Sequence, residues 1–106
     1  MSLLTRREKI VKILIDADRP LSVEEIGLML RLPRGETKQL YDEIRHASRS
    51  LQRKTGGRLA IVMLPPKCTK CGFVFRNLKR PRKPSKCPRC KSERIESPKF
   101  TVRELF

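Results

Sequence analysis

The chain has 106 residues and a net charge of +15, which suits one domain with a small appendage. No apolar run approaches the roughly twenty residues of a membrane span, and charged residues from Arg6 onward exclude a signal peptide, so we expect a cytoplasmic protein with no membrane partner. Residues 67–106 hold 13 Lys and Arg against 3 Asp and Glu, whereas residues 1–66 hold 13 against 8, and this excess predicts a polyanionic partner.

The first predicted helix begins after Thr5, which forms a capping box with Glu8. An apolar face follows at the spacing i, i+3, i+4, i+7, made of Ile10, Ile13, Leu14 and Ala17. Pro20 disfavours a helical conformation at the residue before it, so we expect this helix to end near residue 16.

A second capping box, formed by Ser22 and Glu25, opens a short predicted helix that runs to about Leu30. We expect Ile26, Met29 and Leu30 to supply its buried side. Pro33 and Gly35 then interrupt the helical periodicity and predict a turn over residues 31–35.

The third predicted helix covers residues 36–51, with a buried face made of Leu40, Ile44, Ala47 and Leu51. Three helices joined by short turns predict a helix-turn-helix, in which the third helix reads the major groove. Our candidate DNA-binding residues here are Arg34, Thr37, Lys38, Tyr41, Arg45 and Arg49. Asp42 lies among them and can hold an arginine in place. The alternative is an ordinary solvated charged face.

Two predicted strands follow, over residues 58–64 and 94–103. Pro98 marks the second as an edge strand or a bent one. A helix-turn-helix followed by two strands predicts an α+β winged helix. Residues 1–64 and 94–106 would form it, and residues 65–93 would be a zinc ribbon inserted at the wing.

All four cysteines lie in this insert, as Cys68-Thr-Lys-Cys71 and Cys87-Pro-Arg-Cys90. Two such pairs have the spacing of a four-thiolate metal site, and a cytosolic chain keeps its thiols reduced, which disfavours disulfides. We expect one structural Zn²⁺. Iron is the competitor, because CxxCG and CPxC also resemble the knuckles of rubredoxin and thiolates bind both ions.

Residues 79–86 place five cations between the two pairs. Their prolines favour an extended loop, which can lie along a nucleic-acid backbone, and we expect phosphate contacts from Lys79, Arg80, Arg82 and Lys83. A solubilising tip, or a Pro-x-x-Pro ligand for a partner domain, are the alternatives.

Taken together, the chain resembles a family of predicted archaeal transcriptional regulators that combine a winged helix-turn-helix with a rubredoxin-like zinc ribbon. The resemblance covers nearly the whole chain and rests on the helices over residues 22–51, the CTKCG and CPRC knuckles and the two predicted strands. It implies that Cys68, Cys71, Cys87 and Cys90 bind zinc.

We therefore expect a regulator of transcription that binds double-stranded DNA, although charge alone leaves RNA open. The alternative is an adaptor that contacts RNA polymerase or another transcription factor and has no DNA site of its own. A homodimer is compatible with either function. We expect no enzymatic activity, because His46 is the only histidine and no nucleophile–base pair or phosphate-binding glycine loop is visible.

Overall fold

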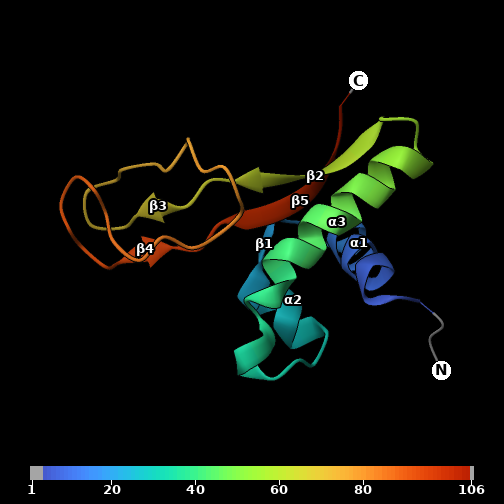
Figure 1. Ribbon diagram of the computed structural model, residues 1–106, viewed down its shortest axis with the longest axis horizontal. Coiled ribbons are helices and arrows are strands. Elements are labelled where there is room, and N and C mark those ends of the chain that lie inside the picture. The colour runs from blue at the N-terminus through green and yellow to red at the C-terminus, as the bar shows by residue number, and fades with distance from the viewer. Residues whose placement is uncertain (1–3, 106) are drawn as a thin grey trace.

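The computed structural model describes residues 4–105 and has two parts (Figure 1). Three helices pack against a small antiparallel sheet, and a thin ribbon extends away from them along the longest dimension of the molecule, 45 Å. The predicted α+β class is confirmed. Within residues 4–105, no helix combines the length and apolarity that crossing a bilayer requires.

Helix α1 (Arg6–Asp16) has the predicted capping box, because the Thr5 side chain accepts from the backbone of Glu8 and the Glu8 carboxylate accepts from the backbone N–H of Thr5. Ile10 and Leu14 are buried, as predicted. The helix ends at Ala17, whose backbone is extended. Arg6 also forms an ion pair of 3.0 Å with Glu43, which ties the start of α1 to the third helix.

Strand β1 (Leu21–Ser22) leads into helix α2 (Val23–Met29), and Ser22 forms the predicted capping box with Glu25. The expectation that Met29 is buried is wrong: Met29 is 54% exposed and Leu28 is 78% exposed. The buried residues of α2 are Val23, Ile26 and Gly27. The buried face is therefore centred between Val23 and Gly27, and Met29 lies at its edge.

Arg31 ends α2 in the left-handed conformation, with a φ of 58°. Its N–H donates to the carbonyl of Leu28, and the N–H of Leu32 donates to the carbonyl of Gly27. This pair of hydrogen bonds is a Schellman motif, in which glycine is the usual residue at the position of Arg31.

The third helix differs from its predicted bounds of 36–51. A short 3-10 helix, η1 (Arg34–Glu36), comes first, and α3 runs over Gln39–Lys54. The tighter turns are held by i to i+3 hydrogen bonds, including one from the N–H of Leu40 to the carbonyl of Thr37. The predicted face is confirmed, because Leu40, Ile44, Ala47 and Leu51 are all buried.

Gly27 lets α2 approach the start of α3 closely. A Cβ at this position would lie 3.1 Å from Cγ2 of Thr37 and 3.6 Å from Cδ1 of Leu40. A side chain at Gly27 would therefore crowd the turn between the two helices.

The first sheet has the strand order β1-β5-β2, with every pair antiparallel. Strand β2 (Leu59–Leu64) matches the prediction to one residue, but the predicted strand over residues 94–103 is two strands, β4 (Ile95–Glu96) and β5 (Lys99–Glu104). Buried Pro98 lies between them, so the bend is the right interpretation of this proline. Strand β5 is the central strand, not an edge.

The two parts have separate hydrophobic cores. Phe100 of β5 is 1% exposed and joins the helices to the sheet; its cluster also contains Ile10, Leu14, Leu21, Val23, Ile26, Leu40 and Ile44. In the ribbon, β3 (Lys67–Cys68) pairs with β4. Its hydrophobic cluster has three buried members, Cys68, Cys87 and Ile95, and Pro66 and Pro84 are buried as well. A core this small indicates that the ribbon depends on its metal site for stability.

Candidate metal centre and nucleic-acid interface

The two cysteine pairs adopt the same local structure. In the first, the N–H of Gly72 donates to the carbonyl of Cys68 over 2.9 Å; in the second, the N–H of Lys91 donates to the carbonyl of Cys87 over 2.9 Å. In both turns the residue whose N–H donates has a left-handed backbone: Gly72 has a φ of 84° and Lys91 a φ of 65°. The pairs are thus two equivalent knuckles.

The knuckles bring four sulfur atoms together. The Sγ atoms of Cys68 and Cys90 lie 3.6 Å apart, as do those of Cys71 and Cys87, and all four lie within 4.8 Å of one another. A disulfide requires about 2.05 Å, so the cysteines are free thiols. A tetrahedral Zn²⁺ with Zn–S bonds of about 2.3 Å needs S–S separations of about 3.8 Å, which this cluster matches.

Backbone amides point at the sulfurs and favour their charged form. The N–H groups of Arg89 and Cys90 both donate to Sγ of Cys87 over 3.4 Å. In the other knuckle, the backbone N–H of Cys71 lowers the pKa of the Cys68 thiol to about 6, against the opposing effect of burial. Thiolates are the form that binds a metal, so the backbone prepares Cys68 and Cys87 for a cation. At Cys71, the backbone N–H of Phe73 is outweighed by burial and by hydrogen bonds with the other three thiols, which raise the pKa to about 11.

Four protein ligands fill a tetrahedral shell and leave no position for a substrate. Two aromatic residues pack against the cysteines together with Ile95. These are Phe73 and Phe75, whose rings meet edge to face with their centroids 5.1 Å apart. These features fit a structural metal rather than a catalytic one.

The candidate DNA-binding residues around α3 occupy different environments. Arg34, Lys38 and Arg49 are exposed, whereas Thr37 and Arg45 are half-buried. The Thr37 hydroxyl donates to the carbonyl of Arg34. Arg45 lies 3.7 Å from the carboxylate of Asp42, so Asp42 is placed to hold this arginine, as predicted.

Tyr41 is half-buried and packs against the hydrophobic core. Its ring centroid lies 6.2 Å from that of Phe100, and burial raises its pKa to about 12, with a smaller effect from Glu24. Tyr41 also lines a depression with Lys38 and Arg82, so its contact with DNA stays a prediction beside this packing role.

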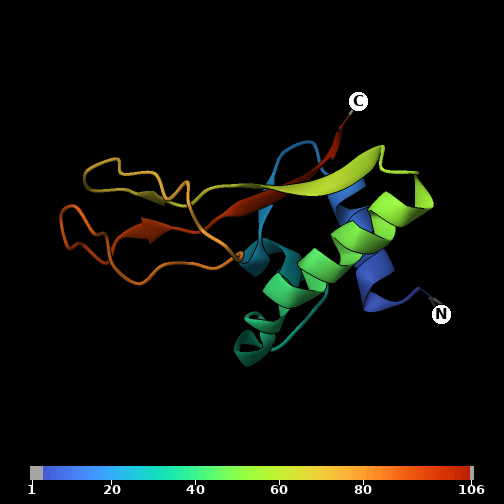
Figure 2. The same cartoon turned by 45° about the horizontal axis from the view of Figure 1, so that its top comes forward.

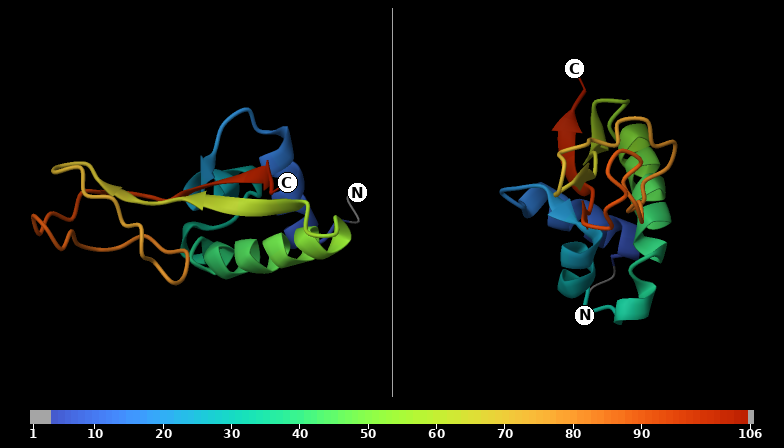
Figure 3. Two further views of the ribbon diagram at one scale, coloured as in Figure 1. Left: turned by 90° about the horizontal axis from the view of Figure 1, so that it is seen from above. Right: turned by 90° about the vertical axis from the view of Figure 1, so that its left-hand side faces the viewer.

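The basic loop of residues 79–86 folds back toward α3 and does not extend into solvent (Figures 2 and 3). Pro81 is half-buried and lines a shallow depression with Arg45 and Arg49. With Arg82 and Lys83 it lines a second one beside Lys38 and Asp42. Lys79, Arg80, Arg82 and Lys83 themselves are exposed.

The structure thus brings part of both predicted basic groups onto one face, which we call the basic face: Lys38, Arg45, Arg49, Arg82 and Lys83. The acidic residues Glu24 and Asp42 lie beside them, and Lys79 and Arg80 line neither depression. Arg34 lies in η1, before this helix. Sequence reasoning missed that Pro81 lies beside α3. A single proline between two arginines carries no periodicity from which its contact could have been predicted.

Two family models match the chain, one over the helical part and one over the ribbon and β5. The profile of the PF0610-like N-terminal family matches residues 5–60, and that of the PF0610 rubredoxin-like zinc beta-ribbon domain matches residues 65–104. The second range contains β5, which pairs with β2 and β1 of the first part.

Among solved structures, the solution NMR structure of protein PF0610 from Pyrococcus furiosus is similar to this chain over 97% of its length and 92% of the other chain, with 33% identity and a TM-score of 0.72. No curated protein matches the sequence. The chain belongs to the PF0610-like family and joins this N-terminal domain to a rubredoxin-like zinc ribbon domain.

Proposed function

We propose that this protein is a winged helix-turn-helix regulator of transcription that binds double-stranded DNA, with one structural Zn²⁺ in its ribbon. The observation that carries the proposal is the basic face, where Lys38 at the N-cap of α3 borders one depression with Arg82 and Lys83 of the ribbon loop. Arg45 and Arg49 of α3 border a second depression, which Pro81 of the loop also lines. Phosphate neutralisation by clustered Lys and Arg is the main source of affinity for duplex DNA.

The order of the elements supports the winged-helix part of the proposal. Helices α2 and α3 are joined by a tight turn, and the strand after α3, β2, pairs with β5 beside β1. The link from β2 to β5 is where a winged helix carries its wing, and here the link is the whole ribbon. The ribbon would therefore take over the contacts of a wing.

The two groups of cations have distinct roles in this proposal. Lys38 and Arg45, near the start of α3, are placed to reach base edges in the major groove. Arg82 and Lys83, beside them, are placed to contact the flanking phosphates. Arg49 lies further along α3 and would contact the backbone. The bound metal would keep the ribbon folded, so that the loop of residues 79–86 stays beside α3.

The charge-removing variant Lys38→Ala/Arg45→Ala tests the role of α3. We expect it to weaken binding of a selected target duplex more than binding of random duplex, since base contacts carry selectivity and phosphate contacts do not. The matched control Lys12→Ala/Lys54→Ala removes the same number of charges on the other side of α3, where both residues line a groove with α1. Equal losses on both duplexes, or equal losses in both variants, would remove the proposed role in readout.

A second candidate function is an adaptor that contacts RNA polymerase. Its supporting observation is the pair of exposed apolar side chains at the end of α2, Leu28 and Met29, which a DNA contact does not explain. The adaptor function predicts that nuclease-treated lysate of the source organism yields polymerase on immobilised protein and that Leu28→Asp abolishes the capture. Capture that needs intact DNA would favour the first function.

A further inference from the structure

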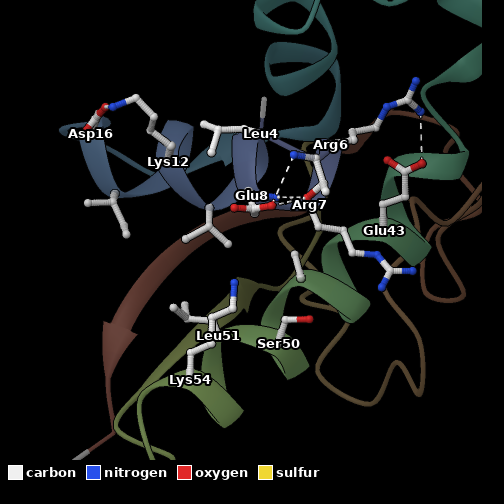
Figure 4. Close-up of a pocket in the computed structure, with 14 residues that line it drawn as sticks. Leu4, Arg6, Arg7, Glu8, Lys12, Asp16, Glu43, Ser50, Leu51 and Lys54 are labelled. Carbon is white, nitrogen blue, oxygen red and sulfur yellow. Dashed lines mark hydrogen bonds and ion pairs between the residues drawn. The ribbon is translucent and has the colours of Figure 1, made fainter. Parts of the chain in front are cut away.

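Helix α1 and the middle and C-terminal turns of α3 border an open groove of about 860 Å³ (Figure 4). In the views of Figures 1 and 3, α1 lies at the end of the molecule opposite the ribbon. Five apolar residues line this groove: Leu4, Val11, Ile15, Ala47 and Leu51. A groove between two neighbouring helices has the shape that receives the side chains of a third helix.

Part of the apolar surface of α1 is not used by the core of its own chain. Ile10 and Leu14 are 0% and 2% exposed, but Ile15 is 54% exposed. Val11, one turn before Ile15, lines the same groove. Residues four apart share one face of a helix, so Val11 and Ile15 form an apolar ridge that borders the groove.

The charge of the groove differs from that of the molecule. Four basic and three acidic residues line it, namely Arg6, Arg7, Lys12, Lys54, Glu8, Asp16 and Glu43, whereas the whole chain carries +15. A nearly neutral surface is one through which two copies of a strongly basic chain can approach with little repulsion.

The charges along α1 are arranged for pairing with themselves. The helix begins with Arg6 and Arg7 and ends at Asp16, with Glu8 in its first turn and an ion pair of 3.6 Å between Lys12 and Asp16. The two arginines and Asp16 stand in the reverse of the order that the helix dipole favours. An antiparallel copy would place the basic start of one α1 against the acidic end of the other. Such self-complementarity is what a twofold interface requires.

We propose that this face is the contact between two copies of the chain, with the two α1 helices antiparallel. Val11 lies near the twofold axis, the ridge of each copy enters the groove of the other, and Arg7 of each copy faces Asp16 of the other. The basic face and the ribbon stay free on both copies. The proposal is independent of DNA binding, because none of its residues belongs to the basic face.

Sedimentation equilibrium of the metal-loaded, nucleic-acid-free protein tests this proposal. With rising concentration, the weight-average mass should increase from the 12.4 kDa of one chain toward twice that value. Ile15→Glu places a charge in the contact and should raise the dissociation constant at least roughly tenfold. The control Leu28→Glu, also at an exposed residue, should leave the dissociation constant unchanged.

A charge exchange tests the antiparallel arrangement. Arg7→Glu alone and Asp16→Lys alone each create two repulsive contacts in a homodimer, so both should be monomers. Mixed in equal amounts, they form heterodimers in which both contacts are attractive, so the mass should rise again. A wild type that stays at one chain mass up to about 1 mM, where even weak contacts of about −4 kcal/mol associate, would overturn the proposal. Dimers that persist in Ile15→Glu, or a mixture that stays monomeric, would do the same.

Discussion

Gly72 and Lys91 close the two knuckles with the same left-handed backbone, at φ values of 84° and 65°. A residue with a Cβ spends about 1–2 kcal/mol in this conformation, whereas glycine adopts it freely. No atom lies within 4 Å of a Cβ built on Gly72, so Gly72→Ala introduces backbone strain without a steric clash. The two positions therefore isolate the effect of backbone conformation on the site.

The substitutions should have opposite effects on the metal. Folding of a small metal domain and binding of its metal are coupled, so strain in a knuckle appears as lost affinity. We expect Gly72→Ala to weaken Zn²⁺ binding by about 1 kcal/mol, or about fivefold. Lys91→Gly should strengthen Zn²⁺ binding by about 0.5 kcal/mol, or about twofold. The gain is smaller than the backbone strain that is removed, because glycine also increases the conformational entropy of the unfolded chain.

Competition with a chromophoric chelator measures both affinities. Gly35→Ala is the matched control, because Gly35 also has open space around its Cβ and has no positive φ. It should leave the affinity unchanged. If Gly72→Ala bound Zn²⁺ as tightly as the wild type, the strain of the left-handed position would not be limiting and the reasoning would be wrong.

Three further predictions concern the helical part. Arg31→Gly should raise the free energy of unfolding by about 0.5–1 kcal/mol in urea denaturation, because Arg31 ends α2 at a φ of 58°; a decrease would count against the Schellman account. Spectrophotometric titration of Tyr41, the only tyrosine, should give a pKa of about 12; since the unfolded value is about 10, stability should fall as pH rises from 10 to 12, and a normal pKa would place the ring in solvent. The ion pair with Arg19 lowers the pKa of Glu25, so its contribution is present above the unfolded value of 4.5 and is lost as pH falls through the lower folded value; Glu25→Gln, which can still cap α2, should be less sensitive to acid between pH 5 and 3, and equal sensitivity would refute this source.

Local patterns predicted the elements that depend on neighbouring residues. The capping boxes at Thr5 and Ser22 are present, because a capping residue and its partner are three residues apart and need nothing else. The buried stripe of α3 is present for a similar reason, since one amphipathic face determines which side is covered. The cysteine spacing likewise predicted a cluster of sulfurs that the structure shows.

Features that depend on distant parts of the chain were not predictable in this way. Met29 falls at helical spacing from Ile26, yet it is exposed because the close approach of α3 at Gly27 sets the buried side of α2. The contact of Pro81 with α3 joins residues far apart in the sequence. The ion pair of Arg6 with Glu43 and the groove beside it depend on the packing of α1 against α3.

Binding of the zinc-loaded protein to random duplex DNA, followed by fluorescence anisotropy at several salt concentrations, addresses the proposed function itself. Each phosphate contact contributes about 0.9 to the slope of log affinity against log salt. Three residues of the basic face are assigned to phosphates, Arg49, Arg82 and Lys83, so we predict a slope with a magnitude of about 3. Absence of binding at low salt, or a slope near zero, would contradict the proposal that this face binds DNA and would leave the adaptor function as the better explanation of the fold.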